Sequence, residues 1–146
     1  MSEAETWREI TEKAIAAQAS DIHLSVGAPA FLRVNGVLQR VSESLVSQIF
    51  LEKLLAGMFS EKQAKQFQKD KEIDLAWSYG KQRFRVNVFQ QISGLAMSLR
   101  LIPNSIPTLE ELGMPAVLRE LLSVPHGLIL VTGRTGSGKT TTLAAF

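Results

Sequence analysis

The stretch that decides the assignment reads GLILVTGRTGSGKTTTLAAF and spans residues 127–146. Its centre, Gly133 to Thr140, matches G-x-x-x-x-G-K-[ST], the pattern of a phosphate-binding loop or Walker A motif. Glycines let successive backbone N–H groups turn toward one centre and bind phosphate oxygens. Lys139 can then reach the β- and γ-phosphates, and the Thr140 hydroxyl can bind Mg²⁺.

The residues around this motif strengthen it. By chance the pattern occurs about once in two hundred chains of this length. The alternative interpretation of these residues is a glycine-rich turn with a surface lysine. Residues 127–132 form an apolar run that predicts a strand buried on both faces, and residues 141–146 suit a helix. The interpretation requires the loop to leave a central β-strand. The predicted nucleotide-binding residues are Gly133, Arg134, Thr135, Gly136, Ser137, Gly138, Lys139, Thr140 and Thr141.

Outward from the motif, the chain divides near residue 103. Residues 103–107, PNSIP, hold two prolines and are the best candidate for a linker and hinge. Before them, hydrophobic periodicity predicts an α+β domain over residues 1–102. After a linker over 103–108, residues 109–146 are too few for a core of their own and resemble the start of an α/β P-loop domain. The expected helices cover 3–18, 44–58, 60–69, 109–112 and 115–122; the expected strands cover 21–26, a hairpin over 30–41 that turns at Asn35-Gly36, 72–78, 83–90, 95–102 and 127–132.

Composition sets the broad class. Of 146 residues, 45% are hydrophobic and 21% charged, which is ordinary for a globular protein. The net charge of only +2 gives no electrostatic case for nucleic-acid binding. The chain has no cysteine, which excludes disulfides and thiolate chemistry. It has no apolar run of 18 residues, and its acidic N-terminus differs from a signal peptide, so we expect a cytoplasmic protein with no transmembrane segment.

Several segments in order along the chain resemble the PilT-like pilus-retraction ATPases of the type IV pilus and type II secretion ATPase superfamily. They span essentially the whole chain, so the resemblance is more specific than the loop alone. The segments are Ala19 to Leu24 (ASDIHL), Arg33 to Gly36 (RVNG), Arg83 to Asn87 (RFRVN), Leu109 to Pro115 (LEELGMP) and Gly127 to Gly133 (GLILVTG).

This resemblance implies a PAS-like N-terminal domain followed by a RecA-like ATPase core, with ATP and Mg²⁺ as cofactors. It also implies a homohexamer on the cytoplasmic face of the inner membrane, acting on an inner-membrane pilus platform protein to power retraction and twitching motility. The nucleotide would lie between the two domains. Lys139, Arg85 and Arg100 would be the catalytic residues, since the family places nucleotide-sensing arginines in the first domain, and Mg²⁺ would bind Thr140.

Each of the weaker signals has a second interpretation. A guanidinium pairs well with phosphate oxygens, but Arg85 and Arg100 could instead pair with Glu72 or Asp74 across the sheet. Arg83 is a third, weaker candidate on the same strand face. Asp21 and His23 share one strand face, which would suit a metal site or an acid–base pair. No third ligand is near in the sequence, so structural polar residues or a subunit contact is the better interpretation. The lysines of the 60–69 helix form one exposed basic face. This face is either solvated or in peripheral contact with anionic lipid.

The chain ends six residues after Thr140, before the family's Asp box, Walker B and His box. We therefore expect no ATP hydrolysis by this polypeptide until the C-terminal part is restored. One alternative is a pilus-assembly or type II secretion ATPase, although the short N-terminus before Trp7 favours retraction. The other alternative is a non-catalytic PAS-like module that binds subunits of a ring.

Overall fold

The computed structural model describes residues 3–134 and 137–146. The chain forms two compact units, Met1–Ile102 and Pro103–Phe146. No helix among the described residues is both long enough and apolar enough to cross a membrane.

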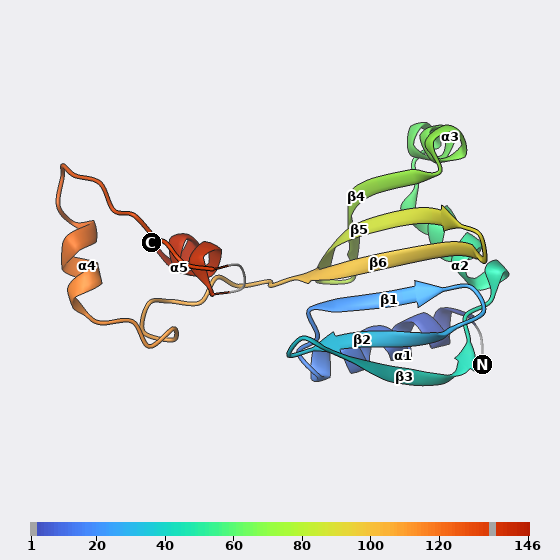
Figure 1. Ribbon diagram of the computed structural model, residues 1–146, viewed down its shortest axis with the longest axis horizontal. Helices are drawn as coiled ribbons and strands as arrows, with labels where there is room; N and C mark the ends of the chain where they lie inside the picture. Colours follow the sequence, from blue (N-terminus) through green and yellow to red (C-terminus); the bar gives the residue numbers. More distant parts are fainter. Residues whose placement is uncertain (1–2, 135–136) are drawn as a thin grey trace. The chain divides into compact units, whose positions relative to one another are not determined.

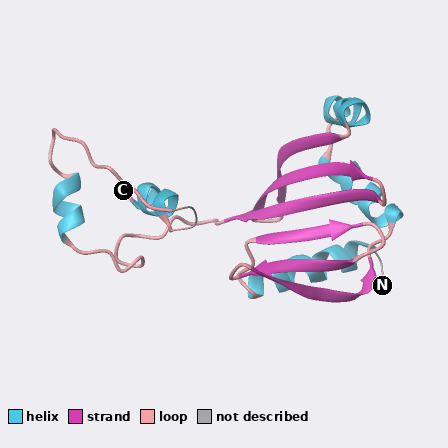
Figure 2. Cartoon of the chain, in the orientation of Figure 1, coloured by secondary structure: helices cyan, strands magenta, loops and turns pink. Residues whose placement is uncertain are grey.

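The first unit is built on one six-stranded antiparallel sheet with the strand order β3-β2-β1-β6-β5-β4 (Figures 1 and 2). Two three-stranded meanders meet where β1 pairs with β6, so the first and last strands of the unit lie at the centre of the sheet. This confirms the expected α+β class. The strands are β1 Asp21–Ser25, β2 Pro29–Val34, β3 Val37–Leu45, β4 Glu72–Tyr79, β5 Gln82–Gln91 and β6 Gly94–Ile102.

Helices pack on one face of this sheet and form the core with it. The helices of the unit are α1 Glu3–Ala16, α2 Gln48–Met58 and α3 Glu61–Asp70. Figure 1 shows α1 behind the β1–β3 half of the sheet and α3 beyond the β4 edge. Apolar side chains alternate along the strands, so Ile22 and Leu24 of β1, like Phe84 and Val86 of β5, are fully buried against the helices. The opposite face carries no helix of this unit among the described residues.

Local signals account for most boundaries in the first unit. The Asn35-Gly36 turn is confirmed: both residues have positive φ, 50° and 83°, as a two-residue hairpin requires. The capping box at α3 is also confirmed, with Ser60 and Gln63 bonding to each other's backbone N–H groups. The helix expected from residue 44 instead begins at Gln48, because β3 continues to Leu45 and Ser47 supplies the N-cap.

The second unit contains two short helices, α4 Val117–Leu122 and α5 Lys139–Ala145. The strand predicted over 127–132 is wrong: these residues have no regular structure, and Leu128 and Leu130 are exposed. A strand of this composition needs neighbouring strands to pair with and helices to cover it. The described part of residues 103–146 contains no strand to serve that purpose. The helix predicted over 109–112 is also wrong, because this stretch forms a turn closed by a bond from the Leu112 N–H to the Thr108 carbonyl.

Candidate functional site

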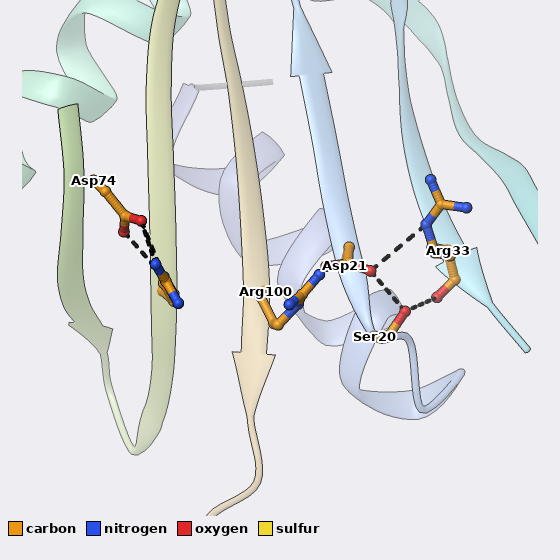
Figure 3. Close-up of polar contacts among 6 residues, drawn as sticks. Ser20, Asp21, Arg33, Asp74 and Arg100 are labelled. Atoms are coloured by element: carbon orange, nitrogen blue, oxygen red, sulfur yellow. Dashed lines mark hydrogen bonds and ion pairs between the residues drawn. The ribbon is translucent and has the colours of Figure 1, made fainter. Parts of the chain in front are cut away.

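Charged side chains concentrate on the sheet face opposite the helices, here called the polar face and marked by Asp21, Arg33, Asp74, Arg85 and Arg100. Figure 3 labels Asp21, Arg33, Asp74 and Arg100 on their strands, with a helix behind the sheet. Their position follows from the period of two in each strand, since the intervening residues, such as Ile22 and Val86, are in the core. The polar face is therefore the functional candidate that the first unit offers.

Strand register places four of these residues in one row across the sheet. Arg85 of β5 lies opposite Arg100 of β6, Arg100 opposite Asp21 of β1, and Asp21 opposite Arg33 of β2. Like charges directly opposite each other destabilise a sheet. Arg85 and Arg100 are such a pair, so each needs a carboxylate on its other side, and each has one.

Asp21 is the carboxylate beside Arg100. Its side chain is only 8% exposed, and Arg100 Nε donates to its Oδ1 at 3.0 Å. Ser20 Oγ donates to Oδ2 at 2.8 Å, and Arg33 Nε lies 3.6 Å from the same oxygen. Burial alone would raise the pKa of Asp21, but the hydrogen bonds from Ser20 and Arg100 outweigh it and hold that pKa below its usual value. Asp21 is thus a buried, ionised anchor for Arg100.

Asp74 is the carboxylate beside Arg85. Arg85 Nε lies 3.0 Å from Oδ2 and 3.2 Å from Oδ1, and its Nη2 donates to Oδ2 at 2.7 Å. These bonds lower the pKa of Asp74 and raise that of Arg85. The pair is open to solvent, with the arginine side chain 67% exposed and the aspartate side chain 45% exposed. One of the two cross-strand pairings considered for Arg85 is therefore present, whereas Arg100 uses neither Glu72 nor Asp74.

His23 lies two residues after Asp21 on β1 and opposite Phe31 of β2. Burial and the positive charge of Arg33 lower its pKa, although Asp21 opposes them. Its Nε2 atom is buried with no hydrogen-bond partner among the described residues, as is Nε1 of Trp7 in the core. His23 is therefore held neutral at pH 7, which suits a structural role.

The glycine-rich loop lies in the second unit. Gly133 has a φ of 149°, a conformation that favours glycine, and a Cβ there would lie 2.7 Å from Ser137 Oγ. Gly138, with φ 87°, precedes α5, and Lys139 is the first residue of that helix. Lys139 Nζ turns back over the loop and donates to the Arg134 carbonyl at 2.7 Å. Thr135 and Gly136 lie outside the described residues.

The groups around this loop suit a phosphate and a hydrated divalent cation. Lys139 supplies an ammonium group, and the exposed Thr140 and Thr141 supply hydroxyl oxygens at the start of α5. No cluster of three His, Cys, Asp or Glu side chains that could hold a metal occurs in the described part of the chain. At this loop, the Thr140 hydroxyl is the group that could bind Mg²⁺ together with phosphate oxygens and water.

Sequence reasoning did not find the role of Asp21 as the partner of Arg100. The two residues are 79 positions apart and meet only because β1 pairs with β6. The available signal was weak: alternation places Asp21 on the same face as His23, but no local pattern tells which strand lies beside β1. Arg85 and Arg100 were expected on adjacent strands, and the register confirms that placement.

Comparison with known proteins gives a consistent result. The profile described as type II/IV secretion system protein matches residues 3–146. The type IV pilus retraction ATPase PilT of Pseudomonas aeruginosa is 44% identical over 128 residues, which cover 87% of this chain and 37% of that protein. A putative type II secretion system protein E of Escherichia coli is 37% identical over 153 aligned positions, covering 93% of this chain and 30% of that protein.

The fold comparison points the same way. A crystal structure of the pilus retraction motor PilT with bound ADP superimposes on this chain with a TM-score of 0.78 at 40% identity. That match covers 94% of this chain and 40% of the other. The chain thus spans less than half the length of the relatives it matches.

Proposed function

Because the chain belongs to the type II/IV secretion system protein family, we propose that it is the nucleotide-binding part of a hexameric motor ATPase that powers type IV pilus retraction. In this proposal Met1 to Ile102 is a PAS-like domain, residues 103–108 are a hinge, and residues 109–146 open a RecA-like domain. The motor works at the cytoplasmic face of the inner membrane on a pilus platform protein. These assignments rest on the resemblance and on the ADP-bound relative.

The strand that should precede the glycine-rich loop is absent from the described residues, so the fold of this unit does not meet the requirement stated for the phosphate loop. The proposal is carried instead by the family match over residues 3–146 and by the ADP-bound relative, and the loop that leads directly into α5 at Lys139 is compatible with it. Lys139 and the amides of residues 133–141 would hold the phosphates of ATP, and Thr140 would hold Mg²⁺. Mg²⁺ would shield the phosphate charge. Arg85 and Arg100, from the same or a neighbouring subunit, would contact the phosphates and stabilise charge that develops during hydrolysis.

The test restores the length of the relatives by joining this chain to the remaining segment of Pseudomonas aeruginosa PilT and measures ATP hydrolysis. Lys139→Ala is expected to reduce turnover at least a hundredfold, since the lysine is the main cation at the phosphates. Lys62→Ala, at an exposed lysine of α3, is the matched control and should keep full turnover. Retained hydrolysis in Lys139→Ala would show that the loop is not the phosphate site.

Two further readouts separate the alternatives. Restored twitching in a retraction-deficient strain supports a retraction motor. Restored pilus assembly in an assembly-deficient strain, or restored secretion in a secretion-deficient strain, without restored twitching supports an assembly or secretion ATPase. A folded restored protein that binds other subunits but hydrolyses no ATP would instead support the non-catalytic module.

A further inference from the structure

The two arginines of the polar face are held by carboxylates of very different character. Asp21, beside Arg100, is 8% exposed and is engaged by Ser20 and Arg33 as well. Asp74, beside Arg85, is 45% exposed, and Arg85 is the one side chain in the described structure that binds it. The two pairs therefore differ in how easily they can open.

Opening the Arg100–Asp21 pair leaves a buried carboxylate with fewer partners, which is strongly unfavourable. Opening the Arg85–Asp74 pair returns both groups to water, and an exposed ion pair contributes little to stability. Arg85 also faces the cation of Arg100 directly across the β5–β6 ladder. When the Arg85–Asp74 ion pair breaks, repulsion between the Arg85 and Arg100 guanidinium groups favours movement of Arg85 toward another anion.

We propose that Asp74 is a positioning residue that holds Arg85 in a neutral pair and releases it to a phosphate chain, whereas Arg100 stays fixed on Asp21. This inference rests on the proposed contact between Arg85 and nucleotide phosphates. It makes Asp74 a competitor of the phosphate for one guanidinium. Removal of the Asp74 charge therefore increases phosphate affinity and leaves the fold unchanged.

The test uses this chain with ¹⁵N-labelled arginine and inorganic tripolyphosphate as the probe, observed by NMR at the arginine Nε–H groups. Asp74→Asn is expected to bind the probe about fivefold more tightly. An exposed ion pair contributes at most about 1 kcal/mol, and this energy corresponds to a fivefold change in affinity. Asp74→Glu, which keeps a carboxylate, should return the affinity to that of the unmodified chain. Thermal unfolding of all variants should be unchanged within a few degrees.

The matched control is Glu72→Gln. Glu72 lies two residues away on the same face of β4 and accepts a hydrogen bond from Asn87, so this change removes one negative charge without freeing an arginine. It should change probe affinity less than twofold. An equal gain in Glu72→Gln and Asp74→Asn would overturn the inference, because the effect would then be general electrostatics.

A second comparison tests whether the gain passes through Arg85. In an Arg85→Lys background, Asp74→Asn should lose most of its effect, because the two-pronged guanidinium is gone. If the probe does not move the Arg85 signal in the unmodified chain or in Asp74→Asn, the inference fails together with the phosphate role of Arg85. The Lys139→Ala measurement in the restored protein is unaffected by that result, so the two failures are distinguishable.

Discussion

Apolar segments of similar sequence form buried strands in the first unit of this chain but remain irregular and exposed in the second unit. In the first unit, apolar residues of every strand but the edge strand β3 are buried, and Phe84, Val86 and Leu99 are all fully excluded from solvent. In the second unit, the apolar run at 127–132 remains without regular structure, and Leu109 is the one buried residue among those described. The contrast shows that apolar composition favours a strand, and that the strand forms where a neighbouring strand is present to pair with it.

The largest expected difference between the units concerns leucine truncation. Leu99→Ala should lower the free energy of unfolding by about 2–5 kcal/mol, because it opens a cavity among fully packed core residues. Leu130→Ala, at a leucine that is 74% exposed, should change it by less than about 0.5 kcal/mol.

Urea unfolding measures this difference. Tryptophan fluorescence reports only on the first unit, since both tryptophans, Trp7 and Trp77, lie there, and circular dichroism reports on both units. Equal losses in Leu99→Ala and Leu130→Ala would mean that the second unit has a core of its own.

The next contrast concerns ion pairs. Asp21→Asn should cost about 1–3 kcal/mol at pH 7, because it removes the negative charge that faces Arg33 and Arg100 and replaces one of the two buried acceptor oxygens with an NH2 donor. Glu110, paired with Arg119 in the second unit, is 58% exposed, and Glu110→Gln should cost less than about 0.5 kcal/mol. Chemical denaturation of the two variants at pH 7 checks both values.

The pH dependence sharpens the same contrast. The folded state holds the pKa of Asp21 below the ordinary value of 3.8, so the folded protein binds fewer protons there than the unfolded chain. Its contribution is complete above about pH 5 and is lost as the pH falls through the folded pKa. Asp21→Asn should therefore flatten the acid side of the stability curve measured from pH 7 to pH 3. An unchanged acid slope would contradict the assignment of Asp21 as an ionised anchor.

The smallest difference between the two units is expected for a pair of glycine substitutions. Gly36→Ala places a Cβ at φ 83° in the β2–β3 turn and should lower the stability of the first unit by about 1 kcal/mol. Gly133→Ala places a Cβ 2.7 Å from Ser137 Oγ and should leave that stability unchanged while removing affinity for a fluorescent ATP analogue. Tight ATP binding by Gly133→Ala would show that the close turn at this glycine is not needed for the phosphate site.

Sequence reasoning found much of the first unit because its signals are local. Alternation revealed β4, β5 and β6, the Asn35-Gly36 pair revealed the first hairpin, and Ser60 with Gln63 revealed the start of α3. The predicted boundaries were wrong where two local preferences competed. At residues 44–47, for example, serines suit both the end of β3 and the start of α2. The polar face was predictable from the same alternation.

By itself, the sequence determined which residues point toward the core, which turns are possible, and that residues 133–140 carry a phosphate-loop pattern. These follow from side-chain volume, backbone sterics and spacing within a few residues. Only the tertiary structure decided that β1 lies beside β6, that Asp21 therefore holds Arg100, and that Asp74 holds Arg85. Pairing between distant strands depends on the packing of the whole sheet, and short-range patterns carry no information about that choice.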